Sequence, residues 1–274
     1  MTITFIGGGN MATALVGGMI ARGTAAADIR VVEPGDAQRE KLAARFPGLV
    51  LHPRTDAAAV AGSELVVLAV KPQHVREVAQ ALAPHLAATT TVLTIAAGIR
   101  LADLARWLGG CPRLVRAMPN TPALVGKGMS GAFALPDVAP EGRRRATAVL
   151  EAGGEVIWVD DEAMLDAVTG VSGSGPAYVF YFLESLEEAA RGLGFTAADA
   201  RRLAYATFSG AIALAEASDH EPAELRAQVT SKGGTTERAL ATMEDSGVKA
   251  GIVAAVRAAA ERARELGDAL GKDA

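Results

Sequence analysis

A glycine-rich turn that begins at residue 7 limits most strongly how this chain can fold. A short run, Ile3-Thr4-Phe5-Ile6, leads directly into Gly7-Gly8-Gly9-Asn10-Met11-Ala12, which fits the pattern G-x-G-x-x-A. Between a strand and a helix, the first glycine permits a tight turn, the second lets backbone approach a pyrophosphate, and the small last residue lets the helix pack against the strand. The helix N-terminus then faces the phosphates. The turn therefore predicts a dinucleotide-binding unit. The simpler alternative is a tight turn that binds no ligand.

The rest of the N-terminal half repeats this alternation of strands and helices. The predicted strands are 3–6, 29–32, 65–70, 91–95, 114–115 and 155–159, and the predicted helices are 10–22, 36–45, 75–82, 101–108 and about 137–152. Short β-branched runs separated by alanine-rich helical stretches are typical of βαβ units. The pattern predicts an α/β fold with a Rossmann-type, doubly wound parallel sheet.

After residue 160 the β-branched runs stop, and the chain reads as helices separated by glycine-bearing turns. Apolar residues keep helical spacing over 177–194 and again over 252–270. We expect two domains, 1–159 and 160–274, the second of them all-helical. Its apolar seams are buried either inside that domain or against a second copy of the chain.

Composition and charge exclude several classes of function. Only 4% of the residues are aromatic, and 27 basic against 31 acidic side chains leave a net charge of −4, so we expect no nucleic-acid partner. The apolar stretches are far shorter than the roughly 20 residues that span a membrane. A single cysteine, Cys111, and the lack of a Cys/His cluster predict neither a disulfide nor a metal site. With a strand predicted at the first residues instead of a signal peptide, we expect a cytoplasmic protein.

One acidic residue bears on the choice of dinucleotide. Glu33 ends the second predicted strand, 21 residues after Ala12, where a carboxylate accepts hydrogen bonds from the adenosine ribose. It suits the 2′-hydroxyl of NAD and repels a 2′-phosphate, so we expect NADH to work at least as well as NADPH. Arg30 and Arg39 are close enough in sequence to argue the opposite, and a solvated surface glutamate is the simpler alternative.

Further candidate residues follow the predicted strands and begin two helices. Lys71 and Gly98 lie in turns at the carboxyl edge of the sheet, where ligands of such sheets bind. The segments 171–178 and 230–237 combine hydroxyl side chains with glycines at predicted helix starts. Exposed N–H groups at such starts suit a substrate carboxylate, with plain helix capping as the alternative.

With these segments in place, the sequence resembles the pyrroline-5-carboxylate reductase family over essentially its whole length. The matching segments, in the family's order and spacing, are FIGGGNMA, AVKP, IAAG, RAMPNTPALV, DAVTGVSGSGPAYVF and SKGGTTERAL. The resemblance implies a Rossmann domain followed by a helical domain that dimerises, with possible assembly of dimers into a larger homo-oligomer. It also implies hydride transfer from NADPH or NADH to the cyclic imine 1-pyrroline-5-carboxylate, the last step of proline biosynthesis.

The resemblance implies site residues as well. The implied cofactor contacts are Ile6, Gly7, Gly8, Gly9, Asn10, Met11, Asp56, Ala69, Val70, Lys71, Pro72, Ala96, Ala97, Gly98 and Gln228. The implied substrate contacts are Glu162, Ser231, Gly234, Thr235 and Thr236, of which Thr236 carries the catalytic role. The chain departs from the family's usual pattern where Asp56 replaces an asparagine, Lys232 a proline and Glu237 an apolar residue. Cofactor choice and substrate affinity depend on these positions.

Hydride attack on a C=N carbon places electron density on nitrogen, so a proton donor helps more than an oxyanion hole. The histidines lie outside the motifs, and we expect the imine to be protonated before or during transfer, with the Thr236 hydroxyl assisting and proximity supplying most of the acceleration. Two alternatives stay open. A reductase of the β-hydroxyacid dehydrogenase type needs a lysine in the first long helix after the nucleotide domain, but no lysine lies between Lys127 and Lys232. A non-catalytic nucleotide sensor would bind the cofactor without turnover.

Overall fold

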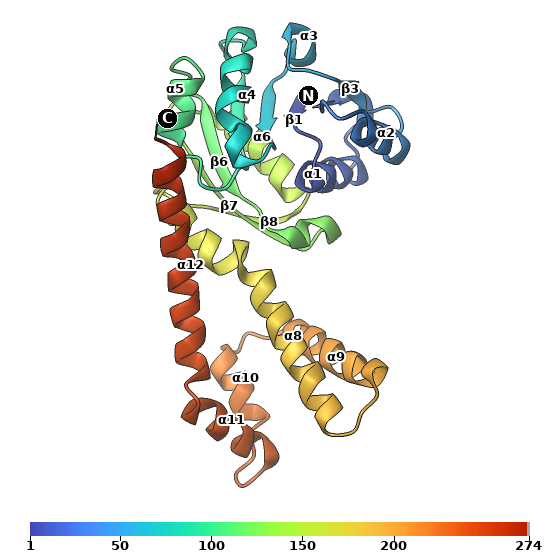
Figure 1. The fold of residues 1–274 in the computed structure, drawn as a ribbon, viewed down its shortest axis with the longest axis vertical. Helices are drawn as coiled ribbons and strands as arrows, with labels where there is room; N and C mark the ends of the chain where they lie inside the picture. Colours follow the sequence, from blue (N-terminus) through green and yellow to red (C-terminus); the bar gives the residue numbers. More distant parts are fainter. Residues whose placement is uncertain (273–274) are drawn as a thin grey trace. The chain divides into compact units, whose positions relative to one another are not determined.

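A computed structural model describes residues 1–272 of the chain (Figure 1). These residues form two compact units, each described by itself below. The first unit comprises residues 1–174 together with the chain from residue 258 onward, and the second comprises residues 175–257. The predicted domain boundary at residue 160 stays a prediction. In the structure, residues 160–174 and the end of the last helix pack within the first unit.

The first unit is built on one twisted sheet whose strand order is β3-β2-β1-β4-β5-β6-β7-β8. Its strands are β1 (Ile3–Ile6), β2 (Ile29–Val32), β3 (Val50–His52), β4 (Leu65–Leu68), β5 (Thr91–Thr94), β6 (Leu114–Met118), β7 (Gly128–Ala134) and β8 (Gly154–Trp158). Strands β1 to β6 are parallel to one another, and the order reverses between β1 and β4. The doubly wound sheet predicted from the sequence is confirmed.

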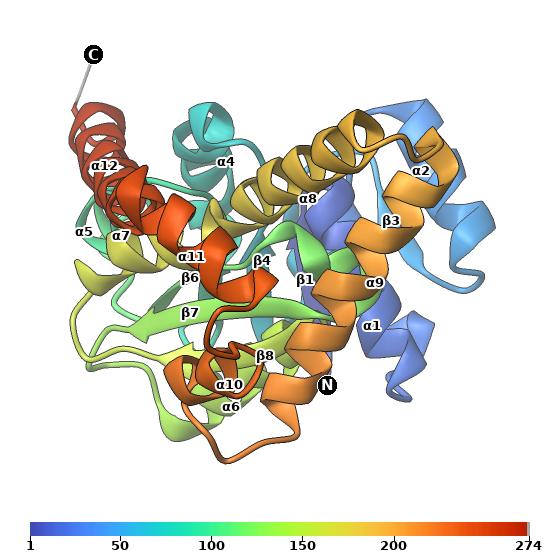
Figure 2. The same cartoon turned by 90° about the horizontal axis from the view of Figure 1, so that it is seen from below.

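Helices cover both faces of this sheet. They are α1 (Asn10–Ala21), α2 (Asp36–Arg45), α3 (Ala57–Val60), α4 (Val75–Leu82), α5 (Leu101–Trp107), α6 (Pro140–Glu151) and α7 (Met164–Val168). Short 3₁₀ turns lie at Ala26–Asp28 (η1), Pro72–His74 (η2), Ala83–His85 (η3) and Thr121–Val125 (η4), and a π-helical turn follows α7 at Thr169–Gly173 (η5). Figure 2 shows α4 and α6 on opposite faces, as expected for right-handed crossovers from a parallel sheet.

Two hydrophobic cores lie on the two faces. One packs β-strand residues against α1, α2 and α6, with Leu15 and Leu150 fully buried. The other packs them against α3, α4 and α5, with Leu82 and Leu104 fully buried. Strands buried on both faces read as continuous apolar runs, which explains why Leu65–Leu68 lacks any alternation.

Two strands depart from the sequence prediction. Strand β7 is antiparallel to β6 and parallel to β8, so the last two strands run against the first six. Strand β3 is a short edge strand beside β2. Neither strand has a distinct β-branched run: β7 contains Gly128 and Gly131, and β3 has three residues. The sheet is therefore mostly parallel, and its last two strands, β7 and β8, run antiparallel to the other six.

The second unit is helical, as predicted. Its helices are α8 (Gly175–Gly192), α9 (Ala197–Glu216), α10 (Pro222–Gln228) and α11 (Thr235–Asp245), and α12 (Val248–Leu270) begins in this unit and ends in the first. Helix α8 has no buried residue: its Tyr181 side chain is 68% exposed, and Leu193, directly after the helix, is 81% exposed. Over the residues that the structure describes, no helix combines the length and the apolar character needed to cross a membrane.

Candidate active site

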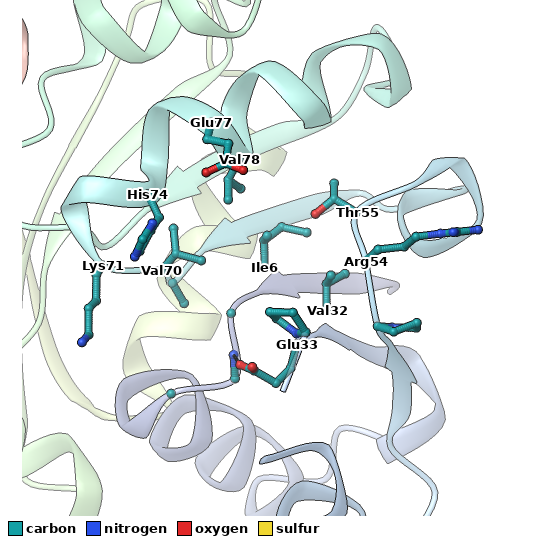
Figure 3. Close-up of a pocket in the computed structure, with 16 residues that line it drawn as sticks. Ile6, Val32, Glu33, Arg54, Thr55, Val70, Lys71, His74, Glu77 and Val78 are labelled. Carbon is teal, nitrogen blue, oxygen red and sulfur yellow. Dashed lines mark hydrogen bonds between the residues drawn. The ribbon is translucent and has the colours of Figure 1, made fainter. Parts of the chain in front are cut away.

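A cavity of about 580 Å³ opens at the carboxyl ends of β1, β2 and β4. The order of the sheet reverses between β1 and β4, and open α/β sheets bind their ligands at such a point. Eight of the predicted cofactor residues line this cavity: Ile6, Gly7, Gly8, Gly9, Glu33, Ala69, Val70 and Lys71. In Figure 3, Lys71 and His74 lie on one side of the cavity and Arg54 and Thr55 on the other.

The glycine turn has the shape that a dinucleotide requires. Gly7 has a φ of +104°, and a Cβ atom there would lie 2.8 Å from the carbonyl oxygen of Ala69. Gly9 is the N-cap of α1, and a Cβ atom there would meet nothing within 4 Å. No side chain caps the first turn of α1. The turn thus offers uncapped helix N–H groups beside open space, which is what a pyrophosphate needs.

Glu33 is fixed in this cavity by backbone hydrogen bonds. Its Oε2 atom accepts from the Gly8 N–H at 2.9 Å, and its Oε1 atom accepts from the Gly35 N–H at 2.9 Å. The Gln38 side chain donates to the Gly8 carbonyl at 2.6 Å, so the Gly8 peptide is held on both sides. The carboxylate is therefore part of the wall of the cavity and is not a freely solvated surface group.

Arg39 and Arg30, the two arginines that could favour a 2′-phosphate, form hydrogen bonds with backbone carbonyl groups. The Arg39 guanidinium donates to the carbonyl groups of Glu33 and Pro34 at 2.7 and 2.8 Å and pairs with Asp36. The Arg30 guanidinium donates to the Ala61 carbonyl at 2.6 Å. Neither lines the cavity. The cavity-lining arginine is Arg54, which the sequence analysis did not single out.

Other predicted cofactor residues lie next to the cavity without lining it. Asn10 and Met11 begin α1, and Pro72 begins the 3₁₀ turn η2 after Lys71. Asp56 is the N-cap of α3, where it accepts from the Ala59 N–H at 3.0 Å and pairs with Arg54 at 3.1 Å. The bond from Ala59, followed by the one from Arg54, holds the pKa of Asp56 below its usual range. Asp56 is therefore an anion at neutral pH and caps its own helix.

Ala96, Ala97 and Gly98 form the turn that leaves β5 at the same edge of the sheet. Glu162, predicted as a substrate contact, is engaged within the first unit. Its Oε1 atom accepts from the Leu101 N–H at 2.9 Å and pairs with Arg116 at 3.0 Å.

The remaining predicted residues lie in the helical unit. Gln228 ends α10, and Ser231, Gly234, Thr235 and Thr236 surround the start of α11. Gly234 is the N-cap of α11, with no side-chain cap. Glu237 accepts from the Gly233 N–H at 2.6 Å, so this carboxylate closes the turn before the helix. Thr236 is half-buried on the first turn of α11.

Several residues of the cavity were not predicted as site residues. They are Val32, Pro34, Pro53, Arg54, Thr55, His74, Glu77 and Val78. Those at 53–55 enter because the edge strand β3 places the chain beside β2, and that strand was not predicted. Those at 74–78 follow Lys71 through η2 into α4, a path that the helical spacing of 75–82 could have indicated. In the described part of the chain, no group of three or more His, Cys, Asp or Glu side chains is arranged to hold a metal ion.

Two family models match this chain in two separate regions. Residues 2–98 match a family described as NADP oxidoreductase, coenzyme F420-dependent. Residues 162–266 match a family described as pyrroline-5-carboxylate reductase dimerisation. The first region contains the cavity and the second contains the helical unit, so the two matches agree with the two parts of the fold.

Whole-chain relatives point the same way. A pyrroline-5-carboxylate reductase from Pseudomonas aeruginosa is 46% identical over 270 residues, covering 98% of both chains. A solved structure of a pyrroline-5-carboxylate reductase from Coxiella burnetii has a TM-score of 0.90 and 37% identity, covering 97% of this chain and 98% of that one. One from Plasmodium falciparum, described as having NADP bound, has a TM-score of 0.85 and 25% identity over the same shares.

Proposed function

The chain belongs to the pyrroline-5-carboxylate reductase family, and from this premise we propose that it reduces the C=N bond of 1-pyrroline-5-carboxylate to give L-proline. The observation that carries the proposal is the cavity at the β1–β4 switch point, whose glycine turn accommodates a dinucleotide. The cofactor supplies the hydride when it is bound. The residues of this chain bind it, orient the imine and assist the proton that reaches the imine nitrogen.

We assign binding of the cofactor to the predicted residues in and beside the cavity, from Ile6 to Met11, from Ala69 to Pro72 and from Ala96 to Gly98. The uncapped N–H groups of α1 would hold the pyrophosphate, because a helix N-terminus attracts anions. The start of α11, also uncapped, is assigned to the substrate carboxylate on the same grounds. The Thr236 hydroxyl assists the proton at the imine nitrogen, and proximity supplies most of the acceleration.

The proposed activity predicts oxidation of the reduced cofactor only when the imine is present. We expect the purified protein to consume NADH or NADPH, followed at 340 nm, with 1-pyrroline-5-carboxylate and to release proline in equal amount. A panel of 3-hydroxy acids with NAD or NADP serves as the comparison. Turnover of the hydroxy acids alone would favour a dehydrogenase of the β-hydroxyacid type, and binding of the cofactor without any turnover would favour a sensor.

For the choice of cofactor, we propose that NADH works at least as well as NADPH. Glu33 supports this because its carboxylate is held in the wall of the cavity, whereas Arg39 and Arg30 are bonded to backbone carbonyls outside it. A 2′-phosphate brought near Glu33 would meet a fixed negative charge.

Replacing Glu33 by Gln is expected to shift this choice. The amide keeps the shape and an acceptor oxygen but removes the charge, so kcat/KM with NADPH should rise relative to NADH by about tenfold, equivalent to about 1.4 kcal/mol. The control is Glu40→Ser, which removes an exposed carboxylate on α2 outside the cavity. This variant should leave the ratio of kcat/KM with NADPH to kcat/KM with NADH unchanged. A large preference of the wild type for NADPH that stays unchanged in Glu33→Gln would contradict the role assigned to Glu33.

We also infer that the protein is a homodimer, which can assemble further, and that it works in the cytoplasm. The helical unit exposes apolar side chains on α8 and α9, such as Phe180, Tyr181 and Leu214, that a second copy would cover. Large apolar side chains left exposed in this way are typical of an interaction surface. The net charge of −4 and the single cysteine support a cytoplasmic protein without a nucleic-acid partner.

A further inference from the structure

The first unit contains two stretches through which the chain enters and leaves the helical unit. The first is residues 159–174, which end where the helical unit begins, and the second is the part of α12 from residue 258 onward. Both stretches contact one short segment, Gly98–Leu101, which joins the turn after β5 to the start of α5. Gly98 and Glu162 are predicted site residues, whereas Arg100, Leu101 and the end of α12 were not predicted to take part.

The end of α12 packs directly on the turn after β5. A Cβ atom on Gly98, whose φ is +75°, would lie 3.0 Å from the Leu270 Cδ1 atom, and one on Gly267 would lie 3.2 Å from the Arg100 Nε atom. Leu270 packs against the hydrophobic core that contains Leu101 and Leu104. The two backbones approach closely because both positions are glycine.

Polar contacts fix the same end of α12. The Arg100 Nη2 atom pairs with the Asp268 Oδ1 atom at 2.6 Å, and the Arg106 Nη2 atom donates to the Gly271 carbonyl at 3.0 Å. Figure 1 shows this end of α12 beside α5. Arg100 and Arg106 thus hold the end of α12 through the Asp268 carboxylate and through the carbonyl of Gly271, the residue after the helix.

The other stretch holds this segment through a partly buried ion-pair cluster. Glu162 accepts from the Leu101 N–H and pairs with Arg116, and Arg116 also pairs with Asp166 at 3.3 Å. The Arg116 side chain is only 6% exposed. Arg116 lies in β6 directly opposite Thr94, the last residue of β5. The cluster therefore joins the start of α5, the end of the strand pair and the chain that leads into the helical unit.

We propose that Gly98–Leu101 is a positioning segment through which the helical part of the chain sets the cofactor turn Ala96–Gly98. Gly267 and Asp268 hold it from α12, and Glu162 holds it from the chain before α8. This assignment rests on the proposed function, in which that turn contacts the nicotinamide cofactor. Displacing the end of α12 should consequently weaken the binding of NADH without any change to a residue that touches it.

The test uses the full-length protein and three substitutions at this contact. Gly267→Val adds bulk against Arg100, Arg100→Met removes the ion pair with Asp268, and Asp268→Asn removes only its charge. Each is expected to raise the Kd for NADH, with the largest effect about three- to tenfold for Gly267→Val. Hydrogen exchange should increase in peptides covering 95–101 and stay unchanged in peptides covering 5–12.

Matched variants separate positioning from general loss of stability. Glu265→Gln changes an exposed carboxylate on the same helix that pairs with Arg262, and it should leave both readouts unchanged. Arg100→Lys keeps a cation and should restore part of the affinity that Arg100→Met loses.

The proposal is overturned if the three variants lower Tm while the Kd for NADH and the exchange of 95–101 stay at wild-type values. A wild type that binds neither NADH nor NADPH would instead overturn the proposed function. In that case the exchange comparison still reports whether the segment is anchored, so the two failures are distinguishable.

Discussion

Gly9→Asp is expected to leave the folded protein at least as stable as the wild type and to abolish useful binding of NADH. Gly9 is the N-cap of α1, its φ of −70° suits any residue, and a Cβ atom there meets nothing within 4 Å. Aspartate is a favourable N-cap, so Tm should stay unchanged or rise by about 1 °C. The same carboxylate would also lie where the pyrophosphate of NADH binds. Repulsion between the two negative charges should weaken the binding of NADH by about 3 kcal/mol, which is more than 100-fold in affinity.

Titration of NADH against the variant, monitored by calorimetry, checks the affinity, and thermal unfolding checks the stability. Gly9→Ala is the control, because it adds the Cβ atom without charge and should lose only about tenfold in affinity through closer backbone contact. If Gly9→Asp still binds NADH within a factor of about three of the wild type, the pyrophosphate does not lie at the start of α1. Unchanged or higher Tm together with weaker NADH binding is expected only if the uncapped start of α1 binds a ligand.

Thr236→Ala is expected to lower kcat/KM for the imine by about 10- to 100-fold, since it removes the hydroxyl assigned to the proton at the imine nitrogen. Thr236 is half-buried on the first turn of α11, a turn that no side chain caps. The Kd for NADH should stay within about twofold of the wild type, because the cofactor is assigned to the first unit. Steady-state kinetics with a separate cofactor titration makes both measurements.

Two other threonine variants show whether the hydroxyl is responsible. Thr236→Ser keeps the hydroxyl and should retain kcat/KM within about threefold. Thr242→Ala removes a hydroxyl that donates to the Arg238 carbonyl on the exposed part of the same helix, and it should have no effect on catalysis. Equal activity in Thr236→Ala and the wild type would remove this residue from the mechanism.

The sequence predicted the strands whose residues are buried on both faces, because such strands are continuous apolar runs. Leu65–Leu68 is of this kind, and the equally buried Thr91–Thr94 combines two β-branched threonines with Val92 and Leu93. It did not predict β3, which has three partly buried residues, or β7, whose glycines allow close packing but carry no β-branched signal. A Cβ atom on Gly131 would lie 2.7 Å from Val168, so that position is glycine for a tertiary reason that local patterns do not contain.

The candidate site likewise contains residues that local motifs predict and residues that only the tertiary structure brings to it. Local motifs were enough to predict the glycine turn, Glu33 and Lys71, because each follows a strand that ends at the cavity. Arg54 was missed because it reaches the cavity only through β3. The contact of Gly267 with Gly98 joins residues far apart in sequence, and no local sequence motif predicts it.

The docking of the last turn of α12 has a consequence for how the protein is made. The hydrogen bonds from Arg100 to the Arg264 carbonyl in this helix and from Arg106 to the Gly271 carbonyl directly after it close loops of 164 and 165 residues. N-terminal domains commonly fold first while the ribosome is still extending the chain. Here the first unit lacks part of its second core until Leu270 has been translated, so its folding is completed only after the whole helical unit has been synthesised. Contacts of such sequence separation also form slowly.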